Sequence, residues 1–135
     1  MGVAAVTGSA SGIGAAIRRR LEADGARVIG VDLRDAELVA DLSTPAGREA
    51  AVAGVLSSCG GRLDRVVISA GVGTHVSSPS LVAAVNYFGA VALVAVVYTI
   101  GAAIPATRIA FHDVRYHLHP GAALLTAFVV VPLGT

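Results

Sequence analysis

The chain has 135 residues, the size of a single domain, and its ten basic and nine acidic residues give a formal net charge of +1. This balance excludes the broad basic surface typical of nucleic-acid-binding proteins. The single cysteine, Cys59, excludes an intrachain disulfide and favours a reducing, cytoplasmic location. The N-terminus reads as a strand, which predicts no signal peptide.

The first predicted elements are a strand over residues 2–6, a helix over 12–24 and a second strand over 27–32. Three glycines lie between the first strand and the helix: Gly8, Gly12 and Gly14. The second strand is a continuous apolar run, typical of a parallel sheet that is covered on both faces, and it ends at Asp32.

This layout predicts a dinucleotide site. Glycines allow the backbone to approach a pyrophosphate, and the helix N-terminus offers free N–H groups and a positive dipole end. The loop backbone expected to hold the pyrophosphate also contains Ser9, Ser11 and Ile13. Asp32, with Leu33 beside it, is expected at the adenosine ribose, where a carboxylate favours NAD over NADP. Arg34 lies near enough to blur that preference.

The next predicted elements are a strand over 38–42, a helix that begins at Thr44-Pro45, and a strand over 63–69. Thr44 is a suitable N-cap, and Pro45 suits the first helical position. Alternating strands and helices predict a parallel sheet with right-handed crossovers. The fold class is therefore α/β, an incomplete Rossmann-like doubly wound parallel sheet of about four strands, followed by an apolar helical tail.

The second half of the chain differs in character, because residues 66–107 contain no Asp, Glu, Lys or Arg. Residues 81–104 are long enough for a helix but lack a polar face, and 108–135 have no clear period. A sheet that ends after its fourth strand, beside uncovered apolar helices, predicts self-association.

Four motifs, in order, make the sequence resemble the short-chain dehydrogenase/reductase family. They are Thr7-Gly8-x-x-x-Gly12-x-Gly14, Asp41-Leu42, Ser69-Ala70-Gly71 and Val85-Asn86-Tyr87-Phe88-Gly89. The short link between the second and third strands is similar to the bacterial 3-alpha-hydroxysteroid dehydrogenase/carbonyl reductase branch. The resemblance covers about residues 1–93 and implies an NAD-binding Rossmann half-domain there, with 94–135 a tail unlike the family.

The resemblance implies hydride transfer between NAD(H) and a carbonyl or hydroxysteroid substrate. It places Asp41 and Leu42 beside the adenine, Ala70 and Gly71 in the cofactor site, and Asn86 at the position of the family's active-site asparagine.

The sequence departs from the family's catalytic pattern of a tyrosine followed four residues later by a lysine. The chain has no lysine, and the residues four positions after its three tyrosines are Val91, Ala102 and Pro120. Arginine is a poor substitute, because it cannot share a proton. The strand that carries the family's catalytic serine is not recognisable. The interpretation is a truncated, catalytically inactive N-terminal half with a frameshifted tail, and the alternative is a tail that evolved as a functional segment.

Other functions stay open from the sequence. One is an NAD-binding module without catalysis, and another is a membrane-associated protein that uses the apolar segment 87–106, which is about 20 residues long. His112, His117 and His119 lack the paired spacing and the fourth ligand of a structural zinc site, so no metal is predicted.

Overall fold

A computed structural model of the chain describes residues 2–73, 75–94 and 96. Among these residues, four parallel strands form one sheet in the order β3-β2-β1-β4. Their bounds are β1 Val3–Thr7, β2 Arg27–Asp32, β3 Leu38–Val39 and β4 Arg65–Ile68. The predicted α/β class and parallel sheet are confirmed.

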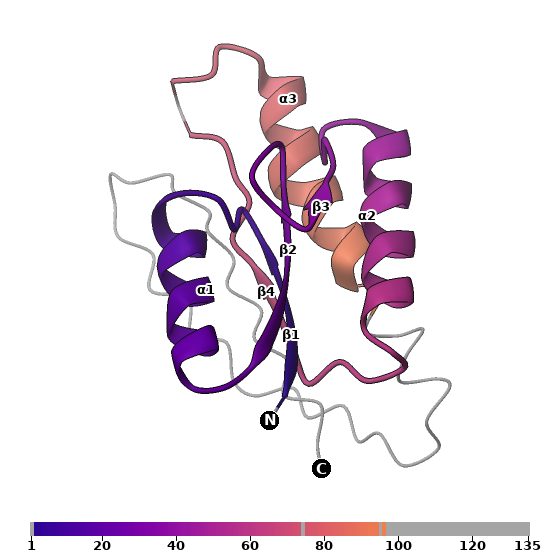
Figure 1. Ribbon diagram of the computed structural model, residues 1–135. Helices are drawn as coiled ribbons and strands as arrows, with labels where there is room; N and C mark the ends of the chain where they lie inside the picture. The colour runs from indigo at the N-terminus through magenta and orange to yellow at the C-terminus, as the bar shows by residue number, and fades with distance from the viewer. Residues whose placement is uncertain (1, 74, 95, 97–135) are drawn as a thin grey trace, which may run out of the picture.

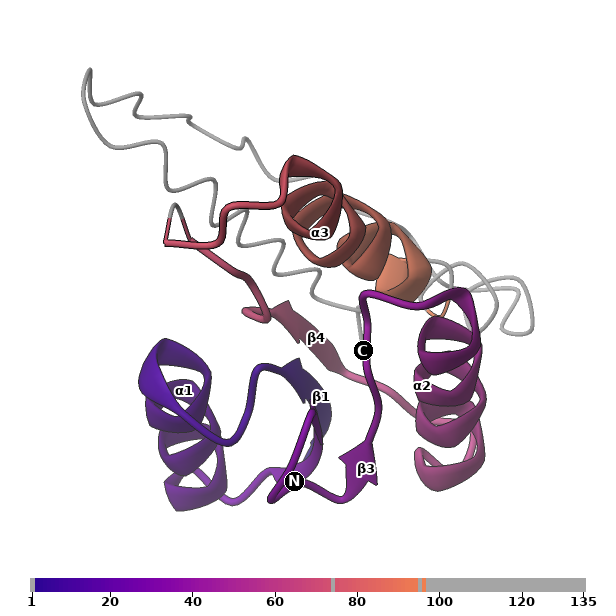
Figure 2. The same cartoon turned by 90° about the horizontal axis from the view of Figure 1, so that it is seen from above.

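Helices cover both faces of the sheet, as Figures 1 and 2 show. Helix α1 (Gly12–Ala23) lies on one face, and α2 (Pro45–Ser58) lies on the other together with α3 (Pro79–Ala83). Helix α3 continues directly into η1 (Ala84–Gly89), a stretch with π-helical hydrogen bonding. The sheet is therefore doubly wound, as the alternation of strands and helices predicted.

Each face of the sheet has its own buried cluster, because successive side chains of a strand point to opposite faces. In β1, Ala4 and Val6 pack with Leu21 of α1, whereas Ala5 belongs to the cluster on the α2 side. That second cluster also contains Leu93 and other residues of β2, β4 and α2. The sheet is therefore fixed by a buried cluster on each face, and this holds the ends of the strands in place.

The predicted start of the second helix is confirmed. The Thr44 hydroxyl accepts a hydrogen bond from the N–H of Gly47 at 3.0 Å, and Pro45 is the first helical residue. The cap satisfies one of the N–H groups that have no partner inside the helix.

The third and fourth strands are shorter than predicted. The chain turns at Asp41 instead of extending β3 to Leu42, because the Asp41 carboxylate accepts from the N–H of Ser43 at 2.9 Å and its carbonyl accepts from Thr44 at 3.1 Å. Strand β4 ends before Ser69, whose N–H binds a side chain instead of a neighbouring strand.

The long apolar helix begins earlier than predicted, at Pro79, because the Ser78 hydroxyl caps it by accepting from the N–H of Leu81. Its predicted extension over 97–104 lies outside the described residues, as do nearly all of the predicted tail 94–135 and the three histidines at 112, 117 and 119.

None of the described helices combines the length and the hydrophobicity that crossing a bilayer requires. Within the described part of the chain, no group of three or more His, Cys, Asp or Glu side chains is placed to hold a metal ion.

Candidate functional site

A cavity of about 580 Å³ opens at the carboxyl ends of the parallel strands. Ligands of open α/β sheets bind at this edge. Twelve of the residues predicted for the site line the cavity: Gly8, Ser11, Gly12, Ile13, Gly14, Asp32, Leu33, Asp41, Leu42, Ala70, Gly71 and Asn86. Residues that are far apart in the sequence thus share one concave surface.

The glycine loop forms one wall of the cavity. Gly8 and Gly12 have positive φ angles of 68° and 54°, which favour glycine. A Cβ on Gly14 would collide with the carbonyl oxygen of Gly8, whereas a Cβ on Gly12 would have nothing within 4 Å. Gly14 therefore lets α1 start against the loop, and Gly12 leaves open space over the loop backbone.

The N-terminus of α1 has N–H groups that no side chain caps. Its N-cap residue, Ser11, makes no side-chain cap hydrogen bond, and the first turn contains no acidic residue. These N–H groups and the dipole of a twelve-residue helix suit a bound anion. The loop and helix therefore fit the pyrophosphate of a dinucleotide.

Ser9 is the predicted site residue that does not line the cavity. Its side chain is buried, and its hydroxyl has no hydrogen-bond partner among the described residues. The hydroxyl lies next to Gly30 of β2, where an added Cβ would meet it, so the side chain points toward the sheet and away from the cavity. A pyrophosphate would therefore meet the loop backbone at this position.

The Asp32 carboxylate is fixed at the edge of the cavity by two backbone N–H groups. One oxygen accepts from Ala10 of the glycine loop at 2.9 Å, and the other accepts from Leu33 at 2.7 Å. Each carboxylate oxygen has a second acceptor position. Asp32 thus stabilises the loop and still has acceptor positions for two ribose hydroxyls.

Thr7, in the predicted glycine motif but given no role there, joins the ends of β1 and β4. Its hydroxyl oxygen is buried and accepts from the N–H groups of Ser69 and Ala70, both at 3.0 Å. The bonds hold the Ala70–Gly71 segment beside the glycine loop. The sequence signal that could have indicated this role is a polar residue, Thr7, at the end of an otherwise apolar strand.

Arg48 of α2 binds the turn at Asp41 and Leu42, which forms another wall of the cavity. Its guanidinium donates to the carbonyls of Leu42 and Ser43 at 3.0 and 3.1 Å, and lies 5.6 Å from the ring centre of Phe88. Hydrogen bonds from Ser43 lower the pKa of the Asp41 carboxyl. The turn is therefore tied to both α2 and η1.

Asn86 holds the loop that follows β4. Its amide oxygen accepts from the N–H of Val72 at 2.8 Å, and its amide nitrogen donates to the Val72 carbonyl at 3.0 Å. Both polar atoms of the side chain therefore bind backbone in this structure, which gives Asn86 a positioning role. Its predicted place in catalysis stays a prediction.

Ten more residues line the cavity; Arg34 was expected near the ribose, and the others were not named as site residues. The ten are Ala10, Val31, Arg34, Ala40, Ile68, Ser69, Val72, Gly73, Val85 and Ala90. Val31 and Ile68 are apolar residues near the ends of β2 and β4, and no sequence signal separates these two from the rest of the core.

The protein-family model described as short chain dehydrogenase matches residues 2–109, which is most of the chain. The chain belongs to the short-chain dehydrogenase family. The match extends past residue 93, where the resemblance found in the sequence ends.

Two curated short-chain dehydrogenase relatives match about the same part of the chain. It is 47% identical over 93 residues to 3-alpha-hydroxysteroid dehydrogenase/carbonyl reductase from Comamonas testosteroni, a match that covers 69% of this chain and 36% of the relative. It is 45% identical over 91 residues to coniferyl-alcohol dehydrogenase from Pseudomonas sp. (strain HR199 / DSM 7063), covering 62% and 33%. The match thus spans about a third of each relative's length.

Among solved structures, the 3-alpha-hydroxysteroid dehydrogenase from Pseudomonas sp. B-0831, complexed with NADH, matches with a TM-score of 0.65 and 52% sequence identity. That match covers 73% of this chain and 42% of the other. The similarity to the hydroxysteroid dehydrogenase branch, first read from motifs, is confirmed by these relatives.

Proposed function

We propose that this short-chain dehydrogenase chain binds NAD(H) in the cavity at the strand ends. The Asp32 carboxylate carries the proposal, because it lies beside an uncapped helix N-terminus and is oriented by two backbone N–H groups. A negative charge there accepts bonds from ribose hydroxyls and repels a 2′-phosphate. The NADH complex of the Pseudomonas sp. B-0831 enzyme supports the same cofactor.

Bound NAD(H) would supply a hydride to a carbonyl, or take one from an alcohol. The named relatives act on hydroxysteroid, carbonyl and coniferyl-alcohol substrates, which supports this substrate class for the complete family fold. For these 135 residues we propose binding without turnover. The chain has no lysine that could lower a tyrosine pKa beside the substrate.

The proposal is tested by calorimetric titration of the full chain with NADH and NADPH. We expect NADH to bind more tightly, and Asp32→Asn to reduce NADH affinity about tenfold, as expected when a hydrogen bond to a charged group is lost. Asp35→Asn is the matched control, because Asp35 is on the same turn, does not line the cavity and has a φ of 51°, which asparagine tolerates.

Tighter binding of NADPH than of NADH would contradict the role given to Asp32. Turnover is measured as NADH oxidation with 3-ketosteroids, aldehydes and quinones, and none above the rate without protein is expected. Activity that disappears in Tyr98→Phe or Tyr116→Phe would contradict the proposal of binding without catalysis.

A further inference from the structure

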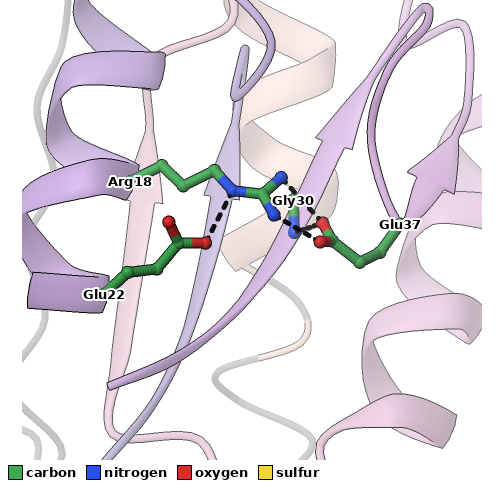
Figure 3. Close-up of polar contacts among 4 residues, drawn as sticks. All are labelled: Arg18, Glu22, Gly30 and Glu37. Atoms are coloured by element: carbon green, nitrogen blue, oxygen red, sulfur yellow. Dashed lines mark hydrogen bonds and ion pairs between the residues drawn. The ribbon is translucent and has the colours of Figure 1, made fainter. Parts of the chain in front are cut away.

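Arg18 of α1 and Glu37 of the turn before β3 form an ion pair that crosses β2 at Gly30, as Figure 3 shows. Two guanidinium nitrogens of Arg18 donate to the two carboxylate oxygens of Glu37: Nη1 binds Oε2 at 3.0 Å, and Nη2 binds Oε1. The third nitrogen donates to Glu22, one helical turn further along α1, at 2.8 Å. This bidentate geometry fixes the orientation of the Glu37 carboxylate.

Glu37 also completes the hydrogen bonding of β2. Alternate residues of a strand face opposite neighbours, and the Val31 carbonyl accepts from Gly8 on the β1 side, so the Gly30 N–H faces β3. Strand β3, however, pairs with β2 from Val31 onward. The Gly30 N–H donates instead to the Glu37 carboxylate at 2.8 Å, so a side chain takes the place of a strand.

The absence of a side chain at Gly30 makes room for this contact. A Cβ there would lie 2.7 Å from a Glu37 carboxylate oxygen and 2.8 Å from an Arg18 nitrogen, and would also meet the Ser9 hydroxyl. The ion pair thus lies directly over the β2 backbone (Figure 3). Arg18 and Glu37 have 23% and 43% of their side-chain surface exposed, so the pair is only partly in water.

The charges of the pair stabilise each other. The pKa of Arg18 is raised, first by its hydrogen bond with Glu37 and then by that with Glu22. Burial raises the pKa of Glu37, but the hydrogen bonds from Arg18 and the backbone outweigh burial and lower it. Both groups are therefore charged near neutral pH.

We propose that Arg18 and Glu37 are positioning residues for Asp32. Gly30 and Glu37 lie on either side of Asp32 in the sequence, and their hydrogen bond closes the segment into a loop anchored to α1. Asp32 in turn binds the N–H of Ala10 in the glycine loop. The pair therefore determines where the Asp32 carboxylate lies, and this inference rests on the proposed function for its effect on NADH.

Amide hydrogen exchange tests the positioning role without a cofactor. In Glu37→Ala we expect the protection of the Gly30 and Ala10 amides to fall about tenfold, as expected when a hydrogen bond to a charged group is lost. Glu37→Gln should keep most of this protection, because its amide oxygen still accepts from Gly30. Arg18→Met should give an intermediate loss.

Arg20→Met is the matched control, because Arg20 pairs with Asp24 on the same helix and does not contact the turn. If Glu37→Ala does not fold, the protection of the Gly30 and Ala10 amides in Glu37→Gln and Arg18→Met tests the proposal. Unchanged protection at Ala10 in a variant that has lost protection at Gly30 would overturn the proposal, because Asp32 would then keep its place without the pair.

The second measurement is the ratio of NADH to NADPH affinity. A displaced Asp32 should lower NADH affinity about tenfold and NADPH affinity less. Both dinucleotides share the loop that Asp32 holds through Ala10, but NADPH has no ribose 2′-hydroxyl contact with Asp32 to lose and is freed from repulsion of its 2′-phosphate. An equal loss of both affinities would overturn the positioning role and leave a general structural one. If the wild-type chain binds neither dinucleotide, the proposed function fails, whereas the exchange result still decides whether the pair positions Asp32.

Discussion

Replacing Thr7 by valine removes one hydroxyl oxygen from the point where β1 and β4 end. Valine has the same shape, so no cavity forms, but the N–H groups of Ser69 and Ala70 lose their acceptor. An unpaired buried polar group costs about 1–3 kcal/mol. Because both residues are half-buried and water reaches them in part, we take the lower end for each, about 2 kcal/mol in total.

Urea denaturation measures this loss. With a slope of about 1–3 kcal/mol per molar for a small domain, the midpoint should fall by about 1 M. Thr7→Ser is the control, because it keeps the acceptor and loses one methyl group, at a cost of about 0.8 kcal/mol. A valine variant at least as stable as the serine variant would refute the reasoning, because the two N–H groups would then need no acceptor.

Three further outcomes follow from the structure. Gly14→Ala should cost about 1–3 kcal/mol of stability and abolish NADH binding in calorimetry, because its Cβ meets the Gly8 carbonyl. Burial raises the pKa of Asp64, but hydrogen bonds from Arg62 and a backbone amide lower it overall. Stability should therefore be full above about pH 4 and fall in more acid solution, less steeply in Asp64→Asn. Val91→Arg should shift a self-associated chain towards monomer in size-exclusion chromatography, because Val91 is 49% exposed.

The glycine loop, the strand alternation and the Thr44 cap were predictable from the sequence because each depends on nearby residues. A positive φ at Gly8 or a cap at Thr44 is decided within a few positions. Alternation of strands and helices then leaves few topologies, and a parallel sheet brings the strand ends, with Asp32 and Ala70, to one edge.

The side-chain bonds that shape the cavity were not predictable in the same way. The Thr7 bonds join residues 62 and 63 positions apart, and the sequence contains no period or spacing that marks them. The role of Glu37 depends on where β3 begins, and the predicted strand had the right start but extended too far. In the sequence alone, Glu37 is one of three charged residues between two strands, and nothing distinguishes it from Arg34 and Asp35.

Asp32 and Asn86 line the cavity, and Thr7 is buried next to the glycine loop; all three side chains bind backbone groups of other loops. Hydrogen bonds within the chain therefore fix the shape of the cavity. A cofactor would meet a preorganised surface, which reduces the entropic cost of ordering the loops on binding. A substitution at any of them changes the position of a loop as well as a local contact. A loss of NADH affinity in such a variant is therefore evidence of direct contact only when the free energy of unfolding is unchanged.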